Sequence, residues 1–234
     1  MAWKKQKFIG KLNHNIYSII PARAQSKRFP GKNSIEFLGL PMIVHSIKYA
    51  QAQEDISEVV VSTDCPEIKK IALTYGAKVI DRPEQLAKDA TPTVDVLQHA
   101  LTVLDDQIEW IVLLQPTNPL RPKDLFKRAQ KAIKATGAKS LFAVSPNHKK
   151  IGNIDQGTFK PLNYNPGMRS QDMPPTFYEN GLLYMTQVDL IRQGMIFDYT
   201  SVPLIVEHPY GQVDIDVPGD LAMAKAIYNI YNNS

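Results

Sequence analysis

Short apolar runs rich in β-branched residues alternate with stretches of helical spacing over the first 145 residues. Five runs predict strands, at Ile16–Ile20, Val59–Val61, Val79–Ile80, Trp110–Leu114 and Leu141–Val144. The apolar spacing between them predicts four helices, around residues 43–50, 68–75, 94–104 and 125–133. Strands that are apolar throughout and separated by helices are typical of a mainly parallel sheet covered on both faces. The alternation therefore predicts a doubly covered α/β fold.

This alternation breaks between about residues 148 and 175, where glycines and prolines interrupt a polar stretch. A hairpin or protruding arm fits that composition best. The pattern resumes with strands predicted at Tyr178–Met185, Val202–Val206 and Val213–Ile215, and a closing helix through Met223, Ile227 and Ile230. A length of 234 residues favours one large domain. We therefore expect a mobile tail at 1–14 and a single domain at 15–234, with the arm inserted at 148–175.

Composition excludes several classes of protein. A single cysteine, Cys65, rules out an intrachain disulfide framework and fits a reducing cytoplasm, which is the location we expect. No apolar run approaches the roughly 18 residues that a membrane span requires. The net charge of +4 is spread along the chain rather than gathered on one stripe with aromatic residues, as nucleic-acid-binding proteins usually show. We expect neither a membrane nor a nucleic acid as partner.

One dense cationic segment stands out from this background. The first predicted strand runs directly into IPARAQSKRFPGKN, whose cations are Arg23, Lys27, Arg28 and Lys32. In open α/β sheets, ligands bind beyond the carboxyl ends of the strands, and both Arg and Lys suit phosphate oxygens. The alternative is a solvated basic loop. The glycine patterns of a Walker loop or a dinucleotide fingerprint are absent, so we expect a different phosphate site here.

Two carboxylates near the C-terminus suggest a metal. Asp214 and Asp216 lie two residues apart on a predicted strand within VDIDVPGD, so their side chains leave the same face. Such a pair repels unless a cation lies between, and Mg²⁺ or Mn²⁺ accepts carboxylate and phosphate oxygens together. The alternatives are solvated edge-strand acids, or helix caps formed by Asp216 and Asp220.

Six motifs occur in an order that resembles one enzyme family. They are IPARAQSKRFPGKN, VVVSTD, DRPEQLA, LLQPTNPLR, MRSQDMPPTFYENGLLY and VDIDVPGD, and they span the chain from about Ile16 to its C-terminus. This set is similar to the acylneuraminate cytidylyltransferases, also called CMP-sialic acid synthetases. The resemblance implies a Rossmann-like nucleotidyltransferase fold, a homodimer held partly through the arm, and dependence on Mg²⁺. It also implies transfer of CMP from CTP to a sialic-type 2-keto sugar acid, with release of pyrophosphate.

The resemblance assigns roles by motif. The residues implied for CTP are Arg23, Ser26, Lys27, Lys32, Asn33, Arg82, Thr93 and Gln115. Those implied for the sugar acid are Gln115, Arg169, Gln171, Asn180 and Tyr184. The catalytic set is Arg23 and Lys27 with Asp214 and Asp216, the last two also carrying the metal. The sequence does not identify the group that takes the proton of the attacking hydroxyl.

Two departures and two alternatives remain open at this point. The family often has a second arginine where Ser170 stands and a serine where Asn118 stands, and the first difference falls in a segment that meets the sugar. A cytidylyltransferase for 3-deoxy-manno-octulosonate would perform the same chemistry on a smaller keto acid. A degenerate nucleotide-binding module without turnover is the non-enzymatic alternative. Sialic, legionaminic and pseudaminic acids cannot be separated as substrates by the sequence.

Overall fold

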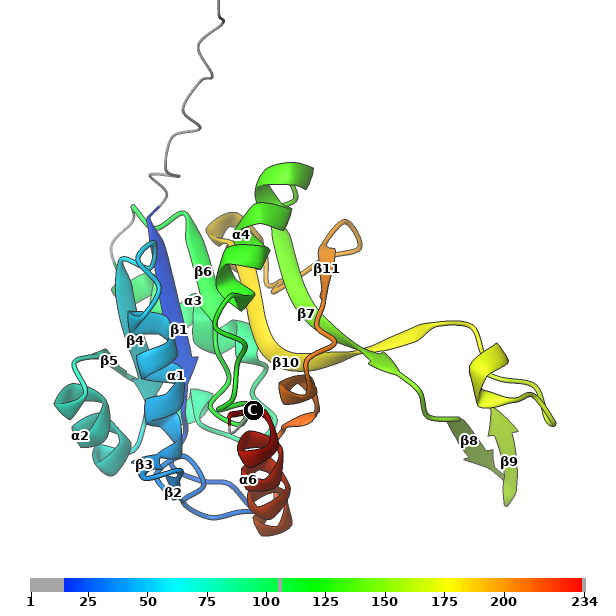
Figure 1. Ribbon diagram of the computed structural model, residues 1–234. Helices are drawn as coiled ribbons and strands as arrows, with labels where there is room; N and C mark the ends of the chain where they lie inside the picture. The colour runs from blue at the N-terminus through cyan, green and yellow to red at the C-terminus, as the bar shows by residue number, and fades with distance from the viewer. Residues whose placement is uncertain (1–14, 105–106, 233–234) are drawn as a thin grey trace, which may run out of the picture.

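A central sheet of seven strands organises the computed structural model, which describes residues 15–104 and 107–232 (Figure 1). Its order is β11-β7-β10-β6-β1-β4-β5. The strands are β1 (Ile16–Pro21), β4 (Glu58–Thr63), β5 (Lys78–Asp81), β6 (Trp110–Leu113), β7 (Ser140–Asn147), β10 (Thr176–Gln187) and β11 (Val202–Ile205). β1 pairs in parallel with β4 and β6, as do β4 with β5 and β7 with β11, whereas β10 runs antiparallel to β6 and β7. The predicted mainly parallel sheet is confirmed.

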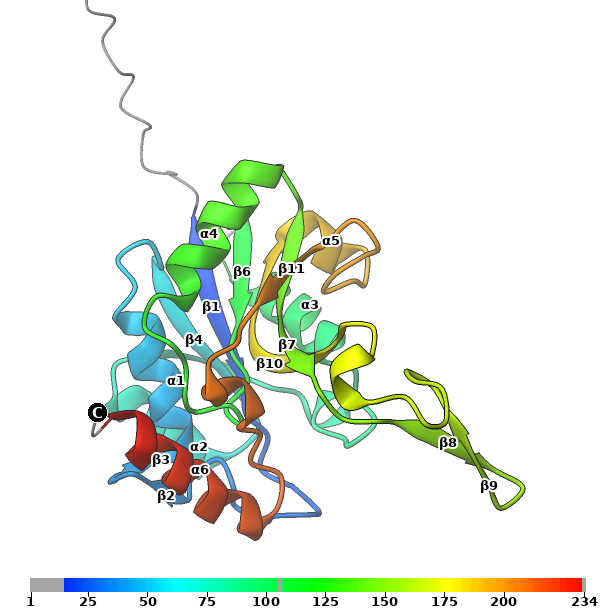
Figure 2. The same ribbon diagram turned by 45° about the vertical axis from the view of Figure 1, so that its right-hand side comes forward.

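Helices cover both faces of this sheet, as Figure 2 shows from a second side. On one face lie α1 (Met42–Gln51), α2 (Pro66–Thr74) and α4 (Leu125–Thr136), packed against strand residues such as Ile20 and Val61. On the other lie α3 (Thr93–Val103) and α5 (Val188–Arg192), packed against Ile19 and Leu113. Consecutive strand residues point to opposite faces, so apolar strands are buried by helices on both sides. This confirms the predicted fold class.

A third apolar cluster packs together the segments that carry the charged motifs. The helix α6 (Pro218–Asn232) contributes Ala224, the cationic loop contributes Phe29, and the acidic segment contributes Val213 and Ile215. The short hairpin of β2 (Glu36–Phe37) and β3 (Leu40–Pro41) adds the fully buried Phe37. Because the cationic loop and the acidic segment share one apolar support, their charged residues face a common space.

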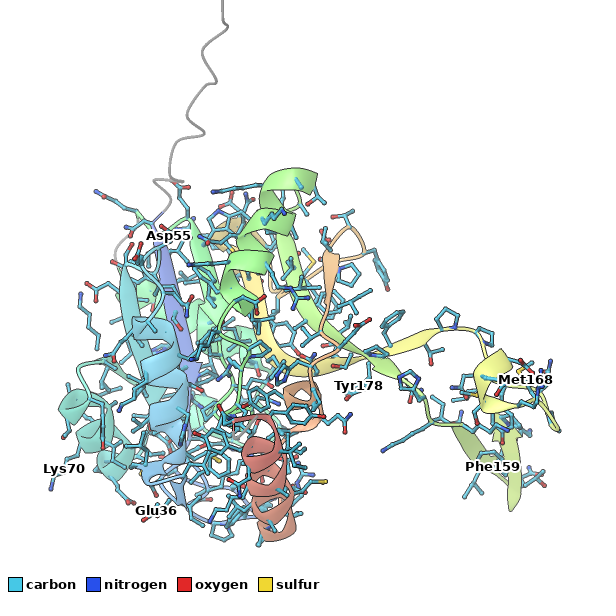
Figure 3. All side chains as sticks on the ribbon, viewed as in Figure 1. Glu36, Asp55, Lys70, Phe159, Met168 and Tyr178 are labelled. Carbon is cyan, nitrogen blue, oxygen red and sulfur yellow. The ribbon has the colours of Figure 1, made fainter. Side chains whose placement is uncertain are left out.

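The segment between β7 and β10 projects away from the sheet (Figure 1). It contains the hairpin of β8 (Gly152–Asp155) and β9 (Thr158–Pro161) and the short turn η2 (Ser170–Asp172). In Figure 3, Phe159 and Met168 lie at the outer part of this arm and Tyr178 at its root. The hairpin leaves apolar side chains in solvent, since Ile154 is 78% exposed and Leu162 61%.

Two details differ from the sequence predictions. No strand forms over Val213–Ile215, which follows the turn η3 (Pro209–Gln212), because its backbone bonds to a loop: the amide of Ile215 donates to Thr117 O at 2.8 Å. In α6, Met223 and Ile230 are exposed, and Ala224 faces the core instead.

The predicted tail at 1–14 lies outside the described residues. Among the described helices, none is long and apolar enough to cross a membrane.

Candidate active site

A cleft of about 440 Å³ opens at the carboxyl ends of β1, β5 and β6. Its charged lining residues are Arg23, Arg28, Lys32, Arg82, Lys88, Asp89, Asp214 and Asp216. Its uncharged polar lining residues are Asn33, Thr91, Thr93, Gln115 and Thr117. The cationic loop after β1 and the acidic segment before α6, far apart in sequence, therefore form two walls of one site.

Two cations of the loop, Arg23 and Lys27, are paired with an aspartate that the sequence analysis did not single out. Asp89 follows η1 (Glu84–Leu86), and its two carboxylate oxygens lie 2.6 Å from Arg23 Nη2 and 2.8 Å from Lys27 Nζ. The hydrogen bond from Lys27, with the charge of Arg23, lowers the pKa of Asp89. These three charged residues come from two loops, the cationic loop after β1 and the loop after η1. An anionic ligand would compete with Asp89 for both cations.

The other two cations of the loop, Arg28 and Lys32, are paired with Asp216. Lys32 Nζ lies 2.7 Å from Asp216 Oδ1, and Arg28 Nη2 lies 2.5 Å from Oδ2. Desolvation would raise the pKa of Asp216, but the hydrogen bond and charge of Lys32, together with Arg28, outweigh it and lower the pKa. The side chain of Lys32 is only 15% exposed, compared with 84% for Lys27. Lys32 is therefore the more deeply placed cation.

Asp214 lies in a different electrostatic environment from its neighbour. Desolvation in the cleft raises the pKa of Asp214, and the charge of Asp216 adds to the rise. A hydrogen bond from the hydroxyl of Thr117 and the charge of Lys32 oppose it. The fold thus holds one carboxylate of the pair with a lowered pKa and the other with a raised pKa, at the same cleft.

Arg82 forms the floor of the cleft beyond β5. It is buried, and its Nη2 donates to Ser62 O at 2.6 Å, which fixes the guanidinium against β4. Desolvation lowers its pKa to about 10, so the group still carries its charge at neutral pH. Arg82 thus contacts the backbone of β4 and lines the cleft, as the resemblance implied for a CTP-binding residue.

The loop after β6, which carries LLQPTNPLR, ties several parts of the site together. The buried Asn118 donates from Nδ2 to Val213 O at 2.8 Å and to Asn180 O at 3.0 Å. The buried Arg121 donates to the carbonyls of Gln115 and Leu182 at 2.8 and 2.7 Å, and desolvation lowers its pKa to about 10. This loop therefore fixes both the acidic segment and an irregularity in β10 that lies between Glu179 and Tyr184.

A second pocket of about 400 Å³ adjoins the cleft and shares Thr93 and Gln115 with it. Its other lining residues are Pro92, Val94, Leu113, Glu179, Tyr184, Gly194, Met195, Ile196 and Phe197. Most of these side chains are apolar, and the ring of Tyr184 stacks on that of Phe197 with their centroids 6.4 Å apart. The two spaces together can hold a polyanionic ligand beside a partly apolar one.

Several residues implied by the resemblance line neither space. Ser26 and Lys27 lie outside both lining sets, and Lys27 instead pairs with Asp89 at the rim. Asn180 is buried, and its amide donates to Ser145 Oγ at 3.0 Å. Arg169 and Gln171 lie on the arm in and beside η2, away from the cleft of their own chain. The motif assignments of these residues remain predictions.

The donor set of the cleft fits a hard divalent cation. Asp214 and Asp216 offer carboxylate oxygens at one wall, and both residues line the same space. Within residues 15–104 and 107–232, no group of three or more His, Cys, Asp or Glu could hold a metal by itself. Mg²⁺ typically uses one or two carboxylates and completes its shell with phosphate oxygens and water. Two carboxylates beside a phosphate-type loop meet that requirement.

The sheet, the cationic loop after its first strand and the facing carboxylates together define an α/β enzyme of the nucleotidyltransferase class. A sequence model described as cytidylyltransferase matches residues 17–203, and the chain belongs to that family. The family resemblance drawn from the motifs is thereby confirmed. Structures of two proteins share the fold: a CMP:2-keto-3-deoxy-manno-octonic acid synthetase complexed with CTP, and a 4-diphosphocytidyl-2C-methyl-D-erythritol synthase. Their TM-scores are 0.67 and 0.66 at 17% and 14% identity, covering 94% and 93% of this chain and 100% of each of those chains.

Three curated relatives are similar to this chain over most of its length. The chain is 34% identical over 228 residues to the CMP-N,N'-diacetyllegionaminic acid synthase of Legionella pneumophila, covering 92% of this chain and 97% of that protein. It is 34% identical over 234 residues to the pseudaminic acid cytidylyltransferase of Campylobacter jejuni, with the same coverage. It is 32% identical over 220 residues to N-acylneuraminate cytidylyltransferase A of Danio rerio, covering 91% of this chain and 50% of that protein.

The raised pKa of Asp214 gives a prediction about stability. An acid whose pKa is higher in the folded state opposes folding once it ionises, so Asp214→Asn should stabilise the free protein at neutral pH. Because Asp214 is partly exposed, we expect less than about 1 kcal/mol, or a rise in Tm of about 1–3 °C. Thermal unfolding at several pH values measures this. The gain should be full above the raised pKa and vanish below the ordinary pKa of an aspartate; a gain that grew as the pH fell would contradict the assignment.

Proposed function

We propose that this protein transfers CMP from CTP to the anomeric hydroxyl of a nonulosonic, sialic-type 2-keto sugar acid and releases pyrophosphate. The observation that carries the proposal is the continuity of a cationic phosphate cleft with a partly apolar pocket through Thr93 and Gln115. A triphosphate suits the first space and an acylated sugar the second. The names of the three curated relatives support the same substrates.

The residues of the cleft supply positioning and charge neutralisation, which dominate transfers of this kind. The anomeric hydroxyl oxygen forms a bond to the α-phosphorus and gives up its proton to solvent, the bond from that phosphorus to the bridging oxygen of the β-phosphate breaks, and pyrophosphate leaves. Arg23, Arg28 and Lys32 would exchange their carboxylate partners for phosphate oxygens, with Arg82 fixed beneath them. Lys27 would leave Asp89 and close over the triphosphate from the rim.

The remaining residues implied for CTP have supporting roles in this proposal. Asn33 is buried at the base of the cationic loop, where its Nδ2 donates to Arg23 O at 3.2 Å and fixes the loop that carries the cations. Ser26 lies in the same loop, beside Lys27. Thr93 begins α3 where cleft and pocket meet, so it can contact both the nucleotide and the sugar.

We propose Mg²⁺, or Mn²⁺ in its place, as the cofactor held by Asp214 and Asp216. When bound, a divalent cation offsets the charge of phosphate oxygens as the leaving group departs. The chain's own contribution is the arrangement of the two carboxylates. Thr117 positions Asp214 through its hydroxyl, and Asn118 holds the backbone of the same segment at Val213.

We propose a homodimer held partly by the arm. Ile154, Phe159 and Leu162 are at least 50% exposed on a hairpin that cannot bury them against itself, whereas a second copy can. Arg169 and Gln171 would then act in the sugar pocket of the partner, since neither lines the cleft or the adjoining pocket of its own chain.

A protein with a single free cysteine also suits the reducing cytoplasm that we propose as its location.

Light scattering at micromolar concentration tests the dimer. We expect a mass near twice 26.3 kDa. Phe159→Asp combined with Ile154→Asp should shift the mass toward one chain, because charges would be buried at the interface. Leu73→Asp, at another exposed apolar position on α2, is the matched control and should leave the mass unchanged. A monomer in the unmodified protein would contradict the proposal.

Nucleotide preference tests the proposed reaction. With a nonulosonic acid present, pyrophosphate release should be fastest with CTP among the four ribonucleoside triphosphates, and it should stop in excess chelator and return with Mg²⁺ or Mn²⁺. Turnover with UTP or ATP that equals the rate with CTP would contradict the proposal. Preference for 3-deoxy-manno-octulosonate as acceptor would favour the alternative keto acid, and binding of CTP without any turnover would favour the degenerate module.

A further inference from the structure

Glu179 places a carboxylate at the second pocket but not at the phosphate cleft. It lies on β10 immediately before the irregularity between Glu179 and Tyr184. No motif assignment gives it a role. Its side chain also borders a shallow apolar hollow on the other side, formed with Phe142, Phe177 and neighbouring residues. Glu179 is an exposed residue, so a ligand bound in the second pocket can reach its carboxylate.

One oxygen of this carboxylate has a fixed partner within the pocket. The hydroxyl of Tyr184 donates to Glu179 Oε2 at 3.1 Å. Tyr184 is buried and stacked on Phe197, so the hydroxyl has little freedom to turn away. Burial, with the charge of Glu179, raises the pKa of Tyr184, so the hydroxyl remains a donor at any working pH. Among the described residues the other oxygen, Oε1, has no hydrogen-bond partner.

The charge distribution across the two spaces sets the orientation of an anionic sugar. The cleft carries Arg23, Arg28, Lys32 and Arg82, whereas the described residues lining the second pocket include no Lys or Arg. A 2-keto sugar acid would therefore turn its carboxylate toward the cations and its remaining substituents toward Glu179. An ionised carboxylate only accepts hydrogen bonds, so it selects a group that donates one.

We propose that Glu179, held by Tyr184, is a specificity-determining residue that accepts a hydrogen bond from an acylamino N–H of the sugar acid. This inference rests on the proposed function and specifies the sugar further. The apolar side chains of Met195, Ile196 and Phe197 line the same pocket and suit the alkyl part of an acyl group. The pocket thus pairs an acceptor for the N–H with apolar surface for the acyl carbons.

A panel of substrates tests the inference on the unmodified enzyme. Three 2-keto sugar acids are compared that differ only in the substituent on one ring carbon: an acylamino group, an N-methylacylamino group, or hydrogen (the deoxy sugar). A hydrogen bond to a charged acceptor is typically worth about 10- to 100-fold. We expect kcat/KM to fall by about that factor when the N–H is removed, with the KM for CTP unchanged. Equal kcat/KM for the acylamino and N-methylacylamino sugars would overturn the inference.

Variants then assign the effect to Glu179. In Glu179→Ala, kcat/KM for the acylamino sugar should fall about 10- to 100-fold, while the N-methyl and deoxy sugars should react as in the unmodified enzyme. Glu179→Gln keeps an uncharged acceptor oxygen and should restore part of the loss. Glu54→Gln, at an exposed position outside both spaces, is the matched control. Tm and CTP affinity, measured on each variant, report whether it is folded.

The outcomes separate this inference from the proposed function. If the unmodified enzyme turns over nonulosonic acids but Glu179→Ala lowers kcat/KM equally for all three sugars, the inference is overturned and the proposed function stands. If the unmodified enzyme releases no pyrophosphate with any acceptor, both are overturned. Selective loss for the acylamino sugar, with partial restoration in Glu179→Gln, supports both.

Discussion

Replacement of Lys32 by alanine is expected to lower kcat with CTP by about 10²–10³, because it removes a preorganised donor beside the reacting phosphates. Among the residues of the cationic loop that pair with a carboxylate across the cleft, Lys32 is the most buried. Its side chain is 15% exposed, and its Nζ lies 2.7 Å from Asp216 Oδ1. Little reorganisation is needed for it to contact a phosphate oxygen at the proposed metal site. Steady-state release of pyrophosphate measures the loss.

Two further lysine variants make the result specific. Lys70→Ala, on the outer side of α2 (Figure 3), is the matched control: it should leave kcat unchanged and change the free energy of unfolding by no more than about 0.5 kcal/mol. The sequence alone predicted the catalytic loss at Lys27, whose side chain the structure shows 84% exposed at the rim. We therefore expect Lys27→Ala to lose less than Lys32→Ala. Near-normal kcat in Lys32→Ala would show that this loop does not hold the triphosphate.

Replacement of Asp216 by asparagine is expected to abolish most turnover and to weaken the binding of divalent cations. The change removes a carboxylate from the proposed metal site and also leaves Lys32 and Arg28 without their anionic partner. A loss of roughly 3–4 kcal/mol in stabilisation of the reacting phosphates corresponds to a fall in kcat of about 10²–10³. Electron paramagnetic resonance of Mn²⁺ with CTP present measures binding independently of turnover.

Asp189→Asn is the matched control for Asp216→Asn, since Asp189 is exposed on α5, outside the cleft, and pairs with Arg192 of the same helix. It should bind Mn²⁺ and turn over CTP as the unmodified protein does. If Asp216→Asn bound Mn²⁺ with full affinity, the acidic segment would have no part in holding the metal, even if turnover fell.

The elements that the sequence predicted well are those defined by repeated apolar side chains. The predicted strands at Ile16–Ile20 and Val59–Val61 form the neighbouring parallel strands β1 and β4, and residues on both faces of these strands are buried. The alternation of Val213, Asp214, Ile215 and Asp216 also places both carboxylates at one cleft, as a strand would. The segment is nevertheless no strand, because its partner is the loop carbonyl of Thr117, and a pairing with a loop leaves no local pattern in the sequence.

The ion pairs that form across the cleft could not be predicted from the sequence. Asp89 lies in a polar loop with no motif of its own, and only the fold brings it to Arg23 and Lys27, more than 60 residues earlier. In the same way, Asn180 belongs to a motif that the resemblance assigns to the sugar acid, yet its amide is buried against Ser145, where β10 is irregular. The sequence signal of this irregularity is the neighbouring Gly181, because its φ of +71° is a conformation that glycine tolerates.

The central claim is that the cleft and the adjoining pocket join CTP to a nonulosonic acid. The most direct measurement incubates the purified protein with CTP, Mg²⁺ and, in parallel, sialic, legionaminic and pseudaminic acids and 3-deoxy-manno-octulosonate, then quantifies pyrophosphate and the CMP-sugar by mass spectrometry. We predict one pyrophosphate for each CMP-nonulosonate formed, with at least one nonulosonic acid preferred over the octulosonate. Pyrophosphate that forms without a sugar, or a CMP-sugar that forms only from the octulosonate, would contradict the account.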